Sequence, residues 1–173
     1  MADVFDNQVE QAWRDDLWRL IEETPQLVWL LLTKRPQNIR KQMPKVGFPA
    51  NVALGTTIAT QSEMRNGEHL KAVPALFHFY SMEPLLEPVE MTVIPDWVIV
   101  GGMSGPSWKE GIVPADWVRS LRDKTKGAGA SFYFKQWSAL RPKGLGCDLD
   151  GRQWKEWPTV PPRFSGDLFG QAA

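Results

Sequence analysis

Leu27-Val28-Trp29-Leu30-Leu31-Leu32 is an unbroken apolar run that ends in the polar cluster Thr33-Lys34-Arg35. The same pattern, a strand-like apolar run followed by polar or glycine residues, occurs four more times along the chain. Runs that are apolar at consecutive positions suit strands buried on both faces, as in parallel sheets. We therefore expect five parallel strands, near residues 27–33, 52–57, 76–81, 97–101 and 131–136.

Helix signals separate these runs. Apolar residues recur at helical spacing between residues 7 and 24, Pro36 and Pro114 suit first helical positions, Ser62 suits a helix cap, and Gly127 suits a helix end. Strands that alternate with helices through short loops predict right-handed βαβ units and an α/β fold. Five strands are too few to close a barrel of about eight, so we expect a partial parallel (β/α) barrel.

Two regions follow from this pattern. We expect the partial barrel to form a domain over residues 1–137. Residues 138–173 are rich in Gly, Pro and charge, and Asp150-Gly151 is typical of a turn. We expect this C-terminal extension to pack on the barrel and to have a loose end.

The polar and glycine residues at the strand ends form the candidate site. The carboxyl ends of parallel strands meet at one edge of the sheet, and α/β proteins build their sites there. We expect a ligand-binding rim, which consists of Thr33, Lys34, Arg35, Thr57, Ser81, Glu83, Gly101, Gly102, Ser104, Lys135 and Gln136.

Parts of this rim have two interpretations. Lys34 and Arg35 are either an anion site for a carboxylate or phosphate or a solvated basic pair. Glu83 either accepts hydrogen bonds from a ligand or pairs with Lys34, Arg35 or Lys135. The glycines of segment 101–105 let a ligand approach the backbone, but the segment is not a GxGxxG motif, so a phosphate cradle has weak support.

Composition narrows the classes of function. Twenty basic residues balance twenty acidic ones, so net charge provides no overall attraction to nucleic acid or to an anionic membrane. No apolar stretch approaches the roughly 20 residues of a transmembrane helix. The single cysteine, Cys147, excludes a thiolate metal cluster built by this chain alone. We expect a cytoplasmic protein without a membrane segment or a metal site of its own.

The nine tryptophans of the chain also have two interpretations. They either fill the core and interfaces, because indole carries a large apolar area with one donor, or provide stacking platforms for nucleic-acid bases.

Several segments together resemble one family. They are Leu-Leu-Thr-Lys-Arg-Pro at 31–36, Ser-Met-Glu-Pro-Leu-Leu at 81–86, Asp-Trp-Val-Ile-Val-Gly-Gly at 96–102, Pro-Ala-Asp-Trp-Val-Arg-Ser-Leu-Arg-Asp at 114–123 and Phe-Lys-Gln-Trp at 134–137. In this order, from Met1 to about Pro158, the chain resembles the phage-encoded, radical-SAM-like family of unknown function that is common in prophages.

The resemblance implies a radical-SAM-like, TIM-barrel-like fold from which the first two strands are missing. In full-length members those strands accompany a three-cysteine motif for a 4Fe–4S cluster, which would bind and cleave S-adenosylmethionine. We therefore expect no cofactor in this chain itself. The family usually has Gly-Gly-Glu-Ser-Gly where this chain has Met103 in segment 101–105, and methionine cannot accept a hydrogen bond as a carboxylate does.

These features lead to three hypotheses about function. The first is a truncated or split phage radical-SAM-like protein of unknown substrate, which is not catalytically competent alone. Its partner is a second copy or a complementing chain that supplies the missing strands. The second is a phage or prophage binding module for nucleic acid or a host protein. The third is a small cluster-independent hydrolase or transferase that uses Glu83 and Lys34 directly.

Overall fold

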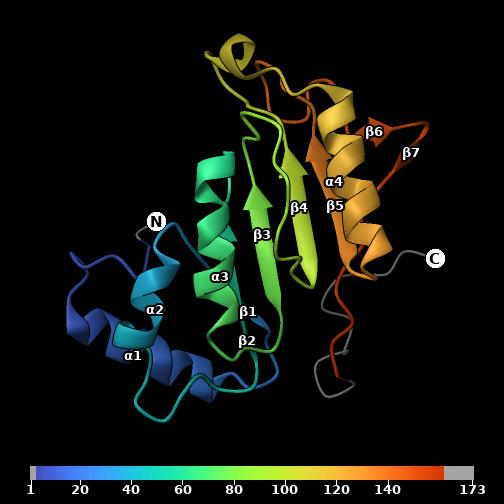
Figure 1. The fold of residues 1–173 in the computed structure, drawn as a ribbon. Helices are drawn as coiled ribbons and strands as arrows, with labels where there is room; N and C mark the ends of the chain where they lie inside the picture. The colour runs from blue at the N-terminus through green and yellow to red at the C-terminus, as the bar shows by residue number, and fades with distance from the viewer. Residues whose placement is uncertain (1–2, 162–173) are drawn as a thin grey trace.

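A five-stranded parallel sheet forms the centre of the molecule (Figure 1). The computed structural model describes residues 3–161. Its elements in chain order, with η for a 3-10 helix, are α1 (Gln11–Glu23), β1 (Trp29–Thr33), η1 (Pro36–Asn38), α2 (Ile39–Gln42), β2 (Val52–Thr57), η2 (Gln61–Met64), α3 (Arg65–Lys71), β3 (His78–Met82), β4 (Trp97–Gly101), η3 (Trp108–Gly111), α4 (Ala115–Gly127), β5 (Ser131–Gln136), β6 (Asp148–Leu149) and β7 (Arg152–Gln153). The predicted α/β fold with five parallel strands is confirmed.

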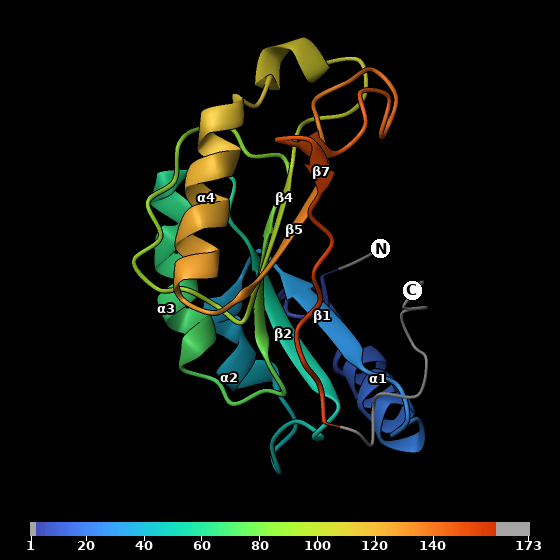
Figure 2. The same cartoon turned by 90° about the vertical axis from the view of Figure 1, so that its right-hand side faces the viewer.

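The order of the strands explains how the layers are arranged. The strands lie in the sheet in chain order, β1-β2-β3-β4-β5, and every neighbouring pair is parallel. Right-handed crossovers between strands in this order place each connecting segment on the same face. Accordingly, α2, α3 and α4 lie on one side of the sheet (Figure 2). Within residues 3–161 the sheet stays open, so the predicted barrel is present only as its parallel α/β part.

The face covered by helices holds the main hydrophobic core. Alternate strand residues such as Leu54, Val98 and Phe132 are fully buried there. Trp18 and Ile21 of α1 belong to the same cluster, because they are three positions apart on one side of that helix. Burial of each such side chain stabilises the fold by about 1.5–3 kcal/mol, so most of the stability resides on this face.

The opposite face, which we call the inner face, is arranged in layers because side chains alternate along each strand. The register of the strands places one layer across Leu32, Gly55, Phe79 and Trp97. The next layer toward the carboxyl ends comprises Thr57, Ser81, Ile99 and Tyr133. A small apolar cluster is centred on Ala53, Phe77, Phe79 and Trp97. On β1, however, Leu30 is 40% exposed and Leu32 is 43% exposed, so this part of the inner face is uncovered.

The two edges of the sheet differ. The segment after β7 runs antiparallel to β5: Phe134 N donates to the Trp154 carbonyl at 2.8 Å, and Glu156 N donates to the Phe132 carbonyl at 3.1 Å. Figure 2 shows this segment on the side of the sheet opposite α3 and α4. The other edge strand is β1, and no second strand pairs with it among residues 3–161. The described part of the extension therefore covers the β5 edge and leaves the β1 edge open.

Two helix starts differ from the sequence prediction. The first helix begins at Gln11 rather than near residue 7, because the Asp6 carboxylate accepts a hydrogen bond in a local turn at this point. The cap near residue 61 is Thr60 rather than Ser62. Thr60 and Glu63 form a capping box, in which each side chain accepts from the other residue's backbone N–H.

None of the described helices is long and apolar enough to cross a membrane.

A two-residue hairpin turn holds the extension against α4. Asp150 and Gly151 both have positive φ, 55° and 78°, as the Asp-Gly hairpin turn requires. Arg119 and Arg122 of α4 donate to the Asp150 carboxylate at 2.8 and 2.6 Å. Hydrogen bonds from Arg119 and then Arg122 lower the pKa of Asp150 from 3.8 to about 2.

Helix α3 lies so close to β3 that only a glycine fits between them. A Cβ on Gly67 would overlap the hydroxyl of Tyr80. This hydroxyl is not free to move, because Tyr80 is 1% exposed and donates to the Val93 carbonyl at 3.0 Å. Burial, and secondly the charge of Glu68, raise the pKa of Tyr80, so the phenol keeps the proton that it donates.

We predict that Asp150→Asn lowers stability near neutral pH. Asn also tolerates positive φ, so the change removes the charge and keeps the turn. Because the pKa of Asp150 is lowered in the folded protein, its ionised carboxylate stabilises the fold at pH values above 3.8, the ordinary pKa. This stabilisation is lost as the pH falls through about 2, the pKa in the folded protein. We expect the urea midpoints of wild type and variant, measured by tryptophan fluorescence, to differ slightly at neutral pH. They should converge as the pH approaches the lowered pKa of Asp150. A difference that does not depend on pH would contradict this account.

We predict that Gly67→Ala destabilises the protein. Helix propensity alone would favour alanine by about 1 kcal/mol, but displacing a buried tyrosine costs about 1–3 kcal/mol, so we expect a net loss of about 1 kcal/mol. Gly127→Ala in α4 is the matched control, because nothing lies within 4 Å of its Cβ position. Urea unfolding of both variants measures the difference, and equal stability of the two would refute the close contact.

Candidate functional site

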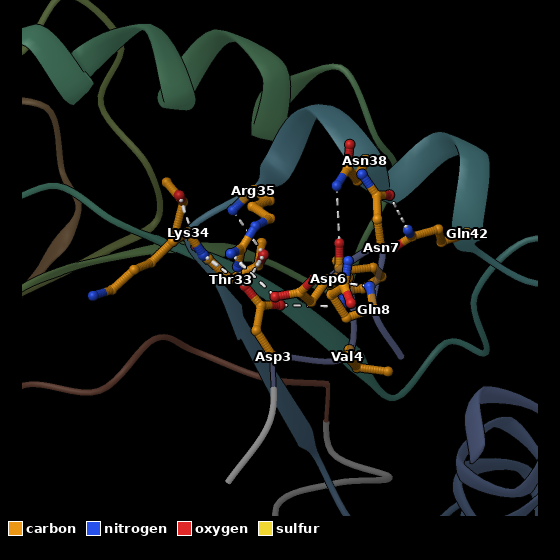
Figure 3. A network of polar contacts seen from close by, with 12 residues as sticks. Asp3, Val4, Asp6, Asn7, Gln8, Thr33, Lys34, Arg35, Asn38 and Gln42 are labelled. Atoms are coloured by element: carbon orange, nitrogen blue, oxygen red, sulfur yellow. Dashed lines mark hydrogen bonds and ion pairs between the residues drawn. The ribbon is translucent and has the colours of Figure 1, made fainter. Parts of the chain in front are cut away.

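The polar residues that follow β1 are tied to the N-terminal segment (Figure 3). One carboxylate oxygen, Asp3 Oδ2, accepts from Thr33 Oγ1 at 2.8 Å, from Lys34 N at 3.1 Å and from Arg35 Nη1 at 3.4 Å. Arg35 forms a second ion pair with Asp6 at 3.1 Å. Internal carboxylates therefore occupy the Lys34 backbone N–H and the Arg35 guanidinium, which are two of the donors expected of an anion site.

The N-terminal segment is held firmly in this position. Phe5 is fully buried and packs against Trp18 and Phe48. Arg14, which is 5% exposed, donates to the carbonyls of Val4 and Asp6. The sequence analysis missed this tether, because nothing in the N-terminal residues indicates which strand end they contact.

A second polar group lies at the carboxyl ends of β2, β3 and β5, on the inner face. Glu83 Oε2 pairs with Lys135 Nζ at 2.8 Å, which matches one of the partners expected for Glu83. Ser81 Oγ lies 3.4 Å from Glu83 Oε1, and Thr57 is level with Ser81 in the sheet. The side chain of Glu83 is 19% exposed and that of Lys135 is 48% exposed, so the pair is accessible to solvent.

Gly101 makes this ion pair geometrically feasible. Glu83 follows β3 and Lys135 lies on β5, so the pair has to pass over β4. A Cβ on Gly101 would lie 3.0 Å from Glu83 Oε2 and 3.2 Å from its Cγ. The absence of a side chain at Gly101 therefore lets the carboxylate lie over the end of β4.

The next glycine is approached by the protein's own backbone. A Cβ on Gly102 would overlap the backbone nitrogen of Ser138. Gly102 N donates to the Gln136 carbonyl at 2.8 Å. The Gln136 side chain donates through Nε2 to the Gly102 carbonyl at 3.3 Å and accepts through Oε1 from Lys143 N at 3.1 Å. Gly102 and the buried Gln136 therefore join the loop after β4 to the extension.

The rest of the 101–105 segment joins the same loop packing. Ser104 is exposed and forms an isolated parallel bridge with Ala139. Met103, at the position where the resemblance implies a glutamate, packs against Gly111, whose Cβ would lie 2.8 Å from Met103 Cε. Ser138, which the sequence analysis missed, is buried and donates to the Gly111 carbonyl at 2.7 Å.

The predicted rim residues thus share one edge of the sheet but form three groups. Thr33, Lys34 and Arg35 contact the N-terminal segment, and Gly102, Ser104 and Gln136 contact the extension. The third group faces the inner side and consists of Thr57, Ser81, Glu83, Gly101 and Lys135. Ser81 and Gly101 are buried, whereas Thr57 and Glu83 are partly exposed and Lys135 is exposed.

A buried aromatic cluster lies below this group on the inner face. Trp97 is within 6.4 Å, centroid to centroid, of four other rings, which are those of Phe77, Phe79, Tyr133 and Trp157. Its buried Nε1 has no hydrogen-bond partner within residues 3–161. Phe77, Phe79, Trp97 and Tyr133 occupy alternate positions of the apolar runs, so period-two spacing is the signal that assigns them to one face. Trp157 comes from the extension and has no such signal.

Cysteine and acidic residues do not assemble into a metal site here. Cys147 is 7% exposed and belongs to the main core cluster. Burial is the largest influence on Lys155 and lowers its pKa, but the hydrogen bond to Cys147 and the proximity of Tyr133 produce a net rise. Among residues 3–161, no group of three or more His, Cys, Asp or Glu side chains could hold a metal ion.

Comparison with known proteins places the chain in a family. No curated protein and no solved structure has significant similarity to it. A family described as "Protein of unknown function (DUF5131)" matches residues 1–158. Because this match spans most of the 173 residues, the chain belongs to the DUF5131 family.

Proposed function

We propose that this chain forms part of a phage or prophage radical-SAM-like (β/α) barrel, that its inner face binds a small ligand, and that a second polypeptide segment supplies the cluster chemistry. The observation that carries the proposal is the one-sided sheet. Helices cover one face, and the other bears the accessible Glu83–Lys135 pair above a buried aromatic cluster. Parallel (β/α) folds bind their ligands at this end of the strands.

The open β1 edge is where the complementing segment would join. Leu30 and Leu32 are exposed on the inner side of this strand, and no strand pairs with its outer edge within residues 3–161. At the other edge, residues 154–156 already occupy the hydrogen-bonding positions of β5. Strands from a second polypeptide, or from a second copy, would therefore extend the sheet from β1 and shield its leucines.

A 4Fe–4S cluster does not fit the residues of this chain. The sequence contains one cysteine, whereas the cluster expected from the resemblance needs three. That cysteine is buried in the core, away from any group of metal-binding side chains among the described residues. We therefore assign to this chain ligand binding and shaping of the inner face, and no redox step.

The two other hypotheses have less support. Of the nine tryptophans, which all lie among the described residues, only Trp13 and Trp157 are exposed, so few indoles are accessible for stacking on bases. A cluster-independent reaction through Glu83 and Lys34 lacks a contact between them, because Glu83 pairs with Lys135.

We predict that the chain, purified alone without oxygen and incubated with iron and sulfide, does not acquire a stoichiometric cluster. It should not bind S-adenosylmethionine tightly either, because the cluster is the site to which that cofactor attaches in the implied chemistry. Iron and sulfide analysis, with isothermal titration of the cofactor, tests both statements. Cys147→Ala is the control for iron held by the single thiol. A stoichiometric cluster in the isolated chain would overturn the proposed division of roles.

We predict that the isolated chain self-associates through the β1 edge. Leu30→Arg combined with Leu32→Arg should shift the association equilibrium toward monomer by tenfold or more, because each arginine would be buried without a partner in the interface. Light scattering over a dilution series measures the shift. Leu145→Arg is the matched control, since Leu145 is 63% exposed in the extension. A monodisperse wild-type monomer at high concentration would contradict the prediction.

A further inference from the structure

We propose that the Glu83–Lys135 pair binds the head group of a zwitterionic ligand, namely the ammonium and carboxylate of an amino acid or an amino-acid derivative. This inference rests on the proposed function of the inner face as a ligand-binding surface, and it specifies the chemical class of the ligand.

The position of the pair differs from that of a surface ion pair. It bridges the ends of two strands that are not neighbours, β3 and β5, and lies over Gly101 of the strand between them. Glu83 is 19% exposed, so its orientation is restricted, whereas Lys135 is 48% exposed. A fixed carboxylate beside a partly hydrated ammonium presents two opposite charges at a defined separation.

The capacity of the two groups for further hydrogen bonds points to a ligand with both charges. An ammonium has three donors, and a carboxylate has about four acceptor positions, so one contact between them leaves most of this capacity unused. A ligand with a single charge would gain one partner and be repelled by the other. A zwitterion gains both, because its carboxylate meets Lys135 and its ammonium meets Glu83.

The surface below the pair indicates what the rest of the ligand resembles. The layer adjacent to the pair carries the hydroxyls of Thr57 and Ser81 beside Ile99 and Tyr133. In the layer below that, Phe79 and Trp97 are buried and Leu32 is exposed. A ligand held by its head group at the pair therefore meets the partly exposed side chains of Thr57, Ile99 and Tyr133 first, and the exposed Leu32 beyond them. This order favours an amino acid with a large apolar or aromatic substituent.

Three small molecules with the same ring test the charge requirement. L-phenylalanine carries both charges, phenethylamine carries the ammonium alone, and 3-phenylpropionate carries the carboxylate alone. Binding to the full chain is followed by NMR shifts of its aromatic and indole resonances near neutral pH. We expect L-phenylalanine to bind at least tenfold more tightly than either analogue.

Variants then locate the site. Glu83→Gln and Lys135→Met should each weaken L-phenylalanine binding by about tenfold, which is typical of the loss of a charged hydrogen-bond partner. Gly101→Ala should weaken it as well, because the new Cβ displaces the Glu83 carboxylate. Glu22→Gln and Lys45→Met remove exposed charges on α1 and on the loop before β2, so they should leave binding unchanged. A thermal melt of each variant confirms that it is folded.

The outcomes separate this inference from the proposed function. Preference for the zwitterion, lost in the Glu83 and Lys135 variants, supports both. Equal binding of all three molecules with shifts of inner-face resonances overturns the head-group assignment and keeps the ligand-binding face. Absence of shifts with every molecule overturns both, and the pair is then a cross-link between β3 and β5.

Discussion

The right-handed crossover between parallel strands is the constraint on which the rest of this structure depends. Because the five strands lie in the sheet in chain order, every crossover returns on the same side, and the helices collect on one face. In a closed barrel the other face would be filled by layers of side chains from the opposite strands. Here the sheet stays open within residues 3–161, so its inner face carries only a small apolar cluster and is exposed at β1.

The glycines of this protein illustrate how a motif acquires its meaning from tertiary contacts. A glycine-rich segment after a strand suggests a place where a ligand approaches the backbone. In this structure the approaching groups belong to the protein itself: the Glu83 carboxylate lies over Gly101, and the backbone of Ser138 lies against Gly102. The first contact orients an ion pair on the inner face, and the second fixes the extension to the sheet. The glycine-rich segment therefore positions neighbouring groups of the site.

Most charged side chains discussed above also serve contacts within the protein. Arg35 is neutralised by Asp3 and Asp6, and Asp150 is held by two arginines of α4, so both clusters fix chain segments to the sheet. Partly exposed ion pairs add little stability each, but they decide where the N-terminal segment and the extension lie. The Glu83–Lys135 pair differs because it lies on the accessible inner face beside hydroxyls and aromatic rings.

The sequence by itself determined the five strands, their parallel pairing and the edge that carries the polar residues, because apolar runs, period and crossover handedness are local or topological properties. It also indicated the Asp150-Gly151 turn, since positive φ at both positions limits the residue types. Only the tertiary structure decided which rim residues share a side. Thr33 and Thr57 both end strands, yet one is buried against Asp3 and the other lies on the inner face. The partners of these side chains come from segments distant in the chain, and local sequence carries no information about such contacts.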